Sequence, residues 1–207
     1  MCKNGYFAQC RIIDLEKQSG VINHFQLEKK IINSLVAVFL LIILSPLILL
    51  LLIIVKLDSR GSVWLRLERA AKVDNCFYIY KIRTMEPGTH KITRAGKFLR
   101  QTGLDEMPQL INVIKAEMSL VGPRPEVPEI VKNYSQYQKQ RLSVLPGITG
   151  LWQISDYRRE PIHNHLEFDL EYIKKKSCFY DLSLIAKTLI WAWNNFIFKN
   201  GSRNRDN

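Results

Sequence analysis

The segment from Ile31 to Val55 is almost wholly apolar, and it constrains the fold more than any other feature of the chain. At 1.5 Å per residue, a straight helix over this segment would reach roughly 37 Å, which is enough to cross a bilayer. A single transmembrane helix is therefore the ordinary interpretation. Residues 1–28 lack the pattern of a signal peptide, so we expect the apolar segment to persist as an anchor.

The midpoint of this segment carries a Ser45-Pro46 step. Pro46 has no backbone N–H and its ring clashes with the Ile42 carbonyl, whereas the Ser45 hydroxyl can satisfy a freed backbone group. We therefore expect a sharp membrane bend at Ser45 and Pro46.

Basic residues flank both ends of the segment: Lys29 and Lys30 before it, and Lys56, Arg60, Arg66 and Arg69 after it. A spanning helix carries positive charge mainly on its cytoplasmic side, so two basic flanks indicate that both ends face the cytoplasm. We favour a re-entrant helix-bend-helix that dips into one leaflet, with a kinked single span as the alternative.

The charge of the chain indicates a phosphate-bearing partner but does not indicate which kind. The formal net charge of +11 attracts phosphates of any kind, whether in nucleic acid, anionic lipid or a nucleotide substrate. The four cysteines are widely scattered, which fits a reducing, cytosol-facing location.

The rest of the chain predicts an α+β, mainly α, compact cytoplasmic domain. Residues 62–85 are typical of a β-hairpin with its turn at 72–75, and a helix from Thr93 ends near Gly103. A second helix is predicted from Asp105 through Ile114. Residues 121–128 are proline-dense and extended, a polar helix follows to about Leu142, and residues 146–150 form a turn.

The C-terminal part predicts an amphipathic helix. Its apolar positions, at helical spacing, are Leu182, Ile185, Leu189, Trp193 and Phe196. Such a face suits a helix at the membrane interface or one packed on the domain core, and the pattern leaves both open. The domain boundaries that we expect are 1–28 for an N-terminal extension, 29–57 for the membrane helix, 58–198 for the catalytic domain and 199–207 for a polar tail.

Asp105 and Glu106 are adjacent carboxylates at a predicted helix start. The helix dipole and free N–H groups would hold such an aspartate ionised, as suits a nucleophile toward phosphorus, and its neighbour could hold Mg²⁺. The ordinary alternative is helix capping without chemistry.

Basic residues outnumber acidic ones between Asp58 and Leu104, so a polyanion could be held near the pair, although a lipid-facing surface explains many of these charges. Arg124 stands between two prolines, whose stiff frame suits phosphate binding.

The order of motifs resembles the bacterial sugar transferase family, the monotopic phosphoglycosyl transferases, over roughly residues 29–192. The motifs are SPLILLLLIIVKLDSRG, FYIYKIRTM, TRAGKFLRQTGLDEMPQLINVIKAEMSLVGPRPE, RLSVLPGITGLWQIS, FDLEYI and DLSLIAKTL.

The resemblance implies a re-entrant helix bent at Ser45-Pro46 and an active site at the cytoplasmic face of the bacterial inner membrane. Asp105 would attack the β-phosphate of a UDP-sugar, release UMP and pass the phosphosugar to polyprenol phosphate. Glu106, with Asp105, would hold Mg²⁺. The residues implied to contact substrate are Lys81, Arg100, Arg124 and Asp169. The product would begin a capsule, exopolysaccharide, O-antigen or glycoprotein glycan, with downstream glycosyltransferases as possible partners and no nucleic acid.

Three positions depart from the family pattern. Relatives commonly read Gly-Arg soon after the Trp-Gln or Ala-Gln pair, where this chain has Asp156-Tyr157. The arginine contact is therefore lost or shifted, with Arg158 as the candidate. Gly103 stands where serine is frequent, and Ala70 where glycine is common.

Two other classes of function stay open at this stage. One is a non-catalytic, membrane-bound interaction protein derived from this family, whose basic face binds lipid or nucleic acid. The other is a transmembrane enzyme of a different phosphotransfer class, which would require the chain after Pro46 to emerge on the far side of the membrane. The sequence does not indicate which sugar is carried.

Overall fold

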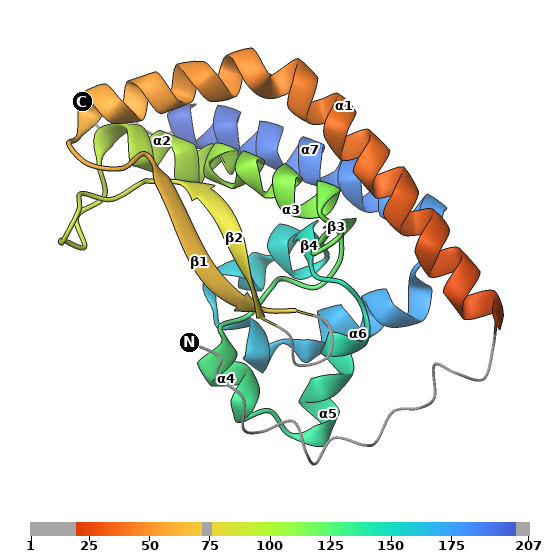
Figure 1. Cartoon of the computed structure of the whole chain (residues 1–207). Helices are drawn as coiled ribbons and strands as arrows, with labels where there is room; N and C mark the ends of the chain where they lie inside the picture. The colour runs from red at the N-terminus through yellow and green to blue at the C-terminus, as the bar shows by residue number, and fades with distance from the viewer. Residues whose placement is uncertain (1–19, 72–75, 202–207) are drawn as a thin grey trace.

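A single long helix, α1 (Gly20–Asp58), arches over one side of the domain in the computed structural model, which describes residues 20–71 and 76–201. The predicted bend is a curve within one uninterrupted helix rather than a break between two helices (Figure 1). Ser45 Oγ donates a hydrogen bond to the Ile42 carbonyl (2.8 Å), the group that Pro46 leaves without its usual donor. The predicted role of the Ser45 hydroxyl is confirmed.

The two faces of α1 differ in burial. Ala37, Leu51 and Val55 are buried against the domain, whereas the outward face exposes large apolar side chains such as Phe39 and Ile42. Within the described residues, α1 is the one helix that is long and apolar enough to cross a membrane. An apolar face of this extent is typical of a surface covered by lipid or by another protein.

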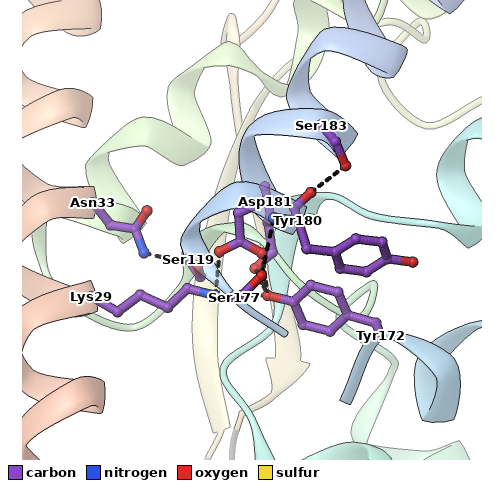
Figure 2. Close-up of polar contacts among 9 residues, drawn as sticks. Lys29, Asn33, Ser119, Tyr172, Ser177, Tyr180, Asp181 and Ser183 are labelled. Atoms are coloured by element: carbon purple, nitrogen blue, oxygen red, sulfur yellow. Dashed lines mark hydrogen bonds and ion pairs between the residues drawn. The ribbon is translucent and has the colours of Figure 1, made fainter. Parts of the chain in front are cut away.

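The N-terminal half of α1 is fixed to the domain by what we call the polar joint, formed by Lys29, Tyr172 and Asp181 (Figure 2). Lys29 Nζ lies 2.6 Å from Asp181 Oδ2 and donates to the Tyr172 hydroxyl at 2.7 Å. That hydroxyl lies 2.9 Å from both Asp181 Oδ1 and the Val121 carbonyl, to one of which it donates. Asn33 also donates to Ser119 Oγ (2.9 Å).

The C-terminal end of α1 is fixed to the same domain. Asp58 Oδ2 accepts the backbone N–H of Ala95, and the buried Arg83 guanidinium donates to the carbonyls of Ser59 and Arg60. Both ends of the apolar helix therefore contact one globular body.

The predicted hairpin is confirmed. Strands β1 (Trp64–Ala70) and β2 (Cys76–Ile82) pair antiparallel, with Leu65 opposite Lys81; the predicted turn at 72–75 lies outside the described residues. The predicted helix after Thr93 is α2 (Arg94–Thr102). Thr93 caps its N-terminus and Gly103 ends it in the left-handed conformation (φ 75°), which glycine adopts readily.

The predicted second helix is only partly α-helical. Its first part is a 3₁₀ helix, η2 (Leu104–Gln109), and the α-helix α3 (Leu110–Ile114) begins where it ends. Pro108 has no N–H to donate to the Leu104 carbonyl, so the first turn cannot complete the α-helical pattern. The acidic pair thus lies in a 3₁₀ turn.

Two predictions for the middle of the chain are wrong. The expected turn at 146–150 contains strand β4 (Gly147–Thr149), which pairs parallel with β3 (Ser119–Val121). The expected polar helix is three short pieces, because residues 133–135 interrupt it: α4 (Pro128–Lys132), α5 (Gln136–Lys139) and the 3₁₀ turn η3 (Gln140–Ser143). Ser135 starts the second piece with a reciprocal capping box.

Three further 3₁₀ turns lead to the C-terminal helices: η4 (Trp152–Ile154), η5 (Asp156–Arg159) and η6 (Ile162–Asn164). Then follow α6 (Leu166–Lys175) and α7 (Cys178–Gly201), and α7 lies beneath α1 in Figure 1. Leu184 of α7 is fully buried, whereas Leu182, Leu189 and Trp193 are about two-thirds exposed. One face of α7 therefore packs in the core, and much of the predicted apolar face is exposed.

Candidate active site

Local structure brings the acidic pair against a cation from the hairpin. Gly103 turns the chain sharply, and Glu106 N donates to the Gly103 carbonyl (3.1 Å) in the first turn of η2. On β2, Lys81 shares its side with the buried Phe77 and Ile79, because alternate residues of a strand point the same way. The Lys81 ammonium therefore points inward, toward η2.

Four side chains form what we call the acidic centre: Lys81, Asp105, Glu106 and Arg124. Lys81 Nζ lies 2.7 Å from Glu106 Oε1 and 3.3 Å from Asp105 Oδ2, so one ammonium bridges both carboxylates. Arg124 Nη2 reaches the same Glu106 oxygen at 3.1 Å. The Asp105 residue is only 7% exposed. The structure brings these four residues, all predicted from the sequence as site residues, into direct contact.

Arg124 comes from the Pro123-Arg124-Pro125 loop that follows β3. Its guanidinium carbon lies 5.7 Å from the centre of the Trp152 ring, within cation–π range. Its side chain is about one-third exposed, so a donor group remains accessible beside Glu106. The proline-framed arginine therefore faces the acidic pair.

The pKa values of Asp105 and Glu106 are shifted in opposite directions. Burial raises the pKa of Asp105, and the charge of Glu106 adds to this effect while Lys81 opposes it. Burial also opposes ionisation of Glu106, but Arg124 and Lys81 together outweigh it and lower the pKa of Glu106 to about 2. The predicted stabilisation of an ionised Asp105 by a helix N-terminus is therefore not the dominant effect. A more basic carboxylate beside a permanently ionised one suits a nucleophile beside a charge-holding group.

The acidic pair offers two carboxylate ligands to a divalent cation. Among the described residues, no group of three or more His, Cys, Asp or Glu side chains is arranged to hold a metal ion. Mg²⁺ in phosphoryl-transfer sites is usually held by one or two carboxylates and by phosphate oxygens of the substrate. Asp105 and Glu106 provide the two carboxylates, so the donor chemistry fits Mg²⁺ bound together with a phosphorylated substrate.

Three other predicted substrate contacts lie elsewhere. Arg100 donates through Nε to Thr84 Oγ1 (2.8 Å) rather than to the acidic pair. The guanidinium of Arg158 lies over the Trp191 ring of α7, 3.9 Å from its centre. Asp169 is 3% exposed and its Oδ2 lies 2.8 Å from Arg141 Nε.

Sequence reasoning missed the contributions of Arg141, Trp152 and Arg69. Arg141 lies beneath the Arg124 loop and Trp152 beside its guanidinium. Arg69 of β1 lies within the electrostatic range of the centre: burial and the charge of Arg124 lower its pKa, while the charge of Glu106 opposes that change. Arg141 and Trp152 belong to the quoted RLSVLPGITGLWQIS motif, but only tertiary contacts reveal their roles.

An acidic pair in contact with two cations, on a domain that carries one long apolar helix, is an arrangement suited to a protein that binds and transfers phosphoryl groups. Residues 24–195 match the family described as bacterial sugar transferase. The chain therefore belongs to the bacterial sugar transferase family, and the predicted resemblance is confirmed.

Several relatives are about one-third identical to the chain. One is the UDP-glucose:undecaprenyl-phosphate glucose-1-phosphate transferase of Xanthomonas campestris pv. campestris, 34% identical over 197 residues; the match covers 84% of this chain and 41% of that relative. The exopolysaccharide production protein ExoY of Sinorhizobium fredii is 33% identical over 190 residues, covering 79% of this chain and 84% of ExoY. The uncharacterized sugar transferase EpsL of Bacillus subtilis is 33% identical over 171 residues, covering 78% and 85%. The chain thus spans about two-fifths of the Xanthomonas protein and most of the two shorter relatives.

Proposed function

We propose that this chain transfers a sugar 1-phosphate from a UDP-sugar to polyprenol phosphate and releases UMP. The observation that carries the proposal is the acidic centre, where two adjacent carboxylates with opposite pKa shifts lie under Lys81 and Arg124. The names of relatives that act on UDP-glucose and undecaprenyl phosphate support the same donor and acceptor classes.

In the proposed first step, a carboxylate oxygen of Asp105 attacks the β-phosphorus of the UDP-sugar. A P–O bond forms to Asp105, the bond to the bridging oxygen breaks, and UMP leaves with the electron pair. In the second step, an oxygen of polyprenol phosphate attacks the same phosphorus and the Asp105 carboxylate departs. Each step is a displacement at phosphorus that the surrounding cations would favour by holding the phosphate oxygens.

The other residues of the centre have separate proposed roles. Lys81 and Arg124 contact the phosphates, because their donors already converge on the site at which negative charge is held. Glu106, with Asp105, would hold Mg²⁺, which neutralises phosphate oxygens when bound. The low pKa of Glu106, about 2, keeps it ionised for this role at neutral pH.

The membrane arrangement is part of the proposal. Lys29 at one end of the apolar segment and Asp58 at the other both bond to the same domain. A straight spanning helix would separate these ends by the bilayer thickness, so their attachment to one body favours a re-entrant helix in a single leaflet. We propose that the domain lies on the cytoplasmic face of the bacterial inner membrane, with the exposed apolar residues of α7 at the interface.

The test is UMP release from a panel of UDP-sugars. The full chain would be placed in nanodiscs with Mg²⁺ and polyprenol phosphate, with UDP-glucose as the first donor. UMP release that requires one sugar donor, with the labelled phosphosugar recovered in the lipid fraction, would support the proposal. Folded protein that releases no UMP from any donor of the panel would contradict it.

The biosynthetic setting follows from the product. A lipid-linked phosphosugar is the starting point for a capsule, exopolysaccharide, O-antigen or glycoprotein glycan, and downstream glycosyltransferases would extend it. The exopolysaccharide role named for ExoY favours this setting.

A further inference from the structure

The guanidinium of Arg141 connects three parts of the fold that are distant in sequence. It is 2% exposed, and its Nε lies 2.8 Å from Asp169 Oδ2 on α6. Nη1 donates to the Tyr134 hydroxyl (2.6 Å), and Nη2 donates to the backbone carbonyl of Arg124 (2.7 Å). All three nitrogens of one side chain are thus used, in directions set by a planar group.

The last of these bonds holds the loop that presents Arg124. Pro123 and Pro125 restrict the loop backbone, and the Gly147 N–H donates to the Pro123 carbonyl (2.8 Å). Arg141 fixes the next carbonyl along the chain. These bonds hold the backbone of the loop, and the Arg124 side chain extends from it to Glu106 and Trp152.

Asp169 completes this support from α6. It is 3% exposed and is the nearer of two carboxylates that pair with the buried Arg141 guanidinium; the other, Glu126 Oε2, lies 4.0 Å from Arg141 Nη1. Removal of one member of a buried ion pair leaves the other in an environment that penalises its charge. The burial and pairing of Asp169 are those of a supporting group and not of a phosphate contact.

We propose that Arg141 and Asp169 are positioning residues, which hold the Arg124 loop so that the Arg124 guanidinium faces the acidic pair. The inference deepens the proposed function, on which it rests, since it gives Arg124 the substrate's phosphates to contact. Lysine at 141 could keep the ion pair with Asp169 but has one nitrogen, which cannot serve three partners in fixed directions. Arginine is therefore the residue that this junction requires.

A double-mutant cycle separates positioning from general stabilisation. Arg141→Lys, Arg124→Lys and the double variant would be compared by kcat/KM for UMP release. Misplacement of a substrate-holding group by about 1 Å costs on the order of 10²-fold, so we expect a loss of that size in Arg141→Lys. In the Arg124→Lys background the same change should cost less than about threefold, because its route of action is already gone. Equal losses in both backgrounds would overturn the inference.

Asp181→Asn is the matched control, because it breaks the polar joint (Figure 2), a second and partly buried ion pair whose partners within the described residues do not include residues 123–125. Its effect on kcat/KM should be the same in the Arg124 and Arg124→Lys backgrounds. Non-additivity as large as that of Arg141→Lys would contradict a specific route through Arg124.

A spectroscopic measurement tests the inference without turnover, and so separates its failure from failure of the proposed function. With Trp64, Trp191 and Trp193 replaced by phenylalanine, the remaining described tryptophan is Trp152, against which Arg124 lies. Arg141→Lys should change its emission in the same direction as Arg124→Met, while Asp181→Asn should leave it unchanged. An emission unaffected by Arg141→Lys, in protein that responds to Arg124→Met, would overturn the positioning role.

Discussion

The polar joint and the acidic centre both bury charge, yet they are built differently. In the joint, one ammonium meets one carboxylate, and the Tyr172 hydroxyl accepts from Lys29 and donates either to Asp181 or to the backbone carbonyl of Val121. In the acidic centre, two neighbouring carboxylates meet Lys81 and Arg124, and both cations concentrate on Glu106.

The consequence is electrostatic. The charges of Arg124 and Lys81 lower the pKa of Glu106 to about 2, whereas burial raises the pKa of Asp105 beside it. Burial of charge is therefore common to structural and chemical sites. A pair of adjacent acids whose pKa values are driven apart is the feature that distinguishes the chemical one.

The largest expected effect comes from substituting the two carboxylates separately. Asp105→Asn and Glu106→Gln should each lower UMP release by at least about 10³-fold. Their effects on stability should have opposite signs, because burial disfavours the charge of Asp105 whereas two cations favour that of Glu106. Thermal unfolding in detergent should show an unchanged or higher midpoint for Asp105→Asn and a lower one for Glu106→Gln. Equal falls in the unfolding midpoints of both variants would show that burial and neighbouring charge do not affect the two carboxyls differently.

Breaking the polar joint should have the reverse profile. Asp181→Asn leaves the Lys29 ammonium without its carboxylate and should destabilise the protein by about 3 kcal/mol. UMP release per folded molecule should change by less than about threefold, since turnover does not pass through the joint. Glu171→Gln, which breaks the exposed Lys175–Glu171 pair (2.8 Å), is the control and should change the midpoint little. A selective loss of turnover in Asp181→Asn would show that the joint is not purely structural.

The dependence of stability on pH should reveal the buried Asp169. Burial raises its pKa to about 6, although the Arg141 charge opposes that rise. Because the folded state then binds the proton more tightly than the unfolded state, the contribution of Asp169 to stability is greatest below its ordinary pKa near 4 and is lost as pH rises through 6. The difference is about 3 kcal/mol.

Unfolding midpoints from pH 4 to 7.5 would test this for the wild type and Asp169→Asn. The midpoint of the wild type relative to the variant should decline over that range. A relative midpoint that rises with pH would mean that pairing outweighs burial at Asp169.

The smallest effect is expected at the bend of α1. Ser45→Ala should cost about 1 kcal/mol, because the Ile42 carbonyl loses its donor. Ser183→Ala is a closely matched control. Ser183 donates to the Tyr180 carbonyl (2.7 Å) at the same helical spacing, but there Leu184 retains the N–H that Pro46 lacks. Equal changes in the unfolding midpoint would show that Pro46 does not create the need for the Ser45 hydroxyl.

Local sequence signals predicted the regular parts of the fold. The apolar segment, the hairpin and the capped helix after Thr93 depend on periodicity and capping, which neighbours in sequence determine. The parallel pair β3–β4 was missed because Gly147–Thr149 is short and turn-like, and its partner lies 28 residues earlier at Ser119. Pairing between distant three-residue strands has no local pattern.

The site was predictable to the extent that its residues have distinctive motifs. Asp105, Glu106, Lys81 and Arg124 stand in the motifs quoted above, and the structure places them in contact. Asp169 was predicted as a substrate contact, but in the structure it is buried against Arg141. This pairing depends on tertiary packing, which the sequence pattern does not indicate. That packing is also why Arg141 gave no signal of its own.

The most direct test of the central claim is the mass of the intact protein after exposure to the UDP-sugar donor and Mg²⁺ without polyprenol phosphate. The account predicts an added mass equal to one phosphosugar in wild type, absent in Asp105→Asn and discharged when polyprenol phosphate is added. UMP release with no added mass at any time, or an adduct that persists in Asp105→Asn, would contradict the assignment of Asp105 as the nucleophile.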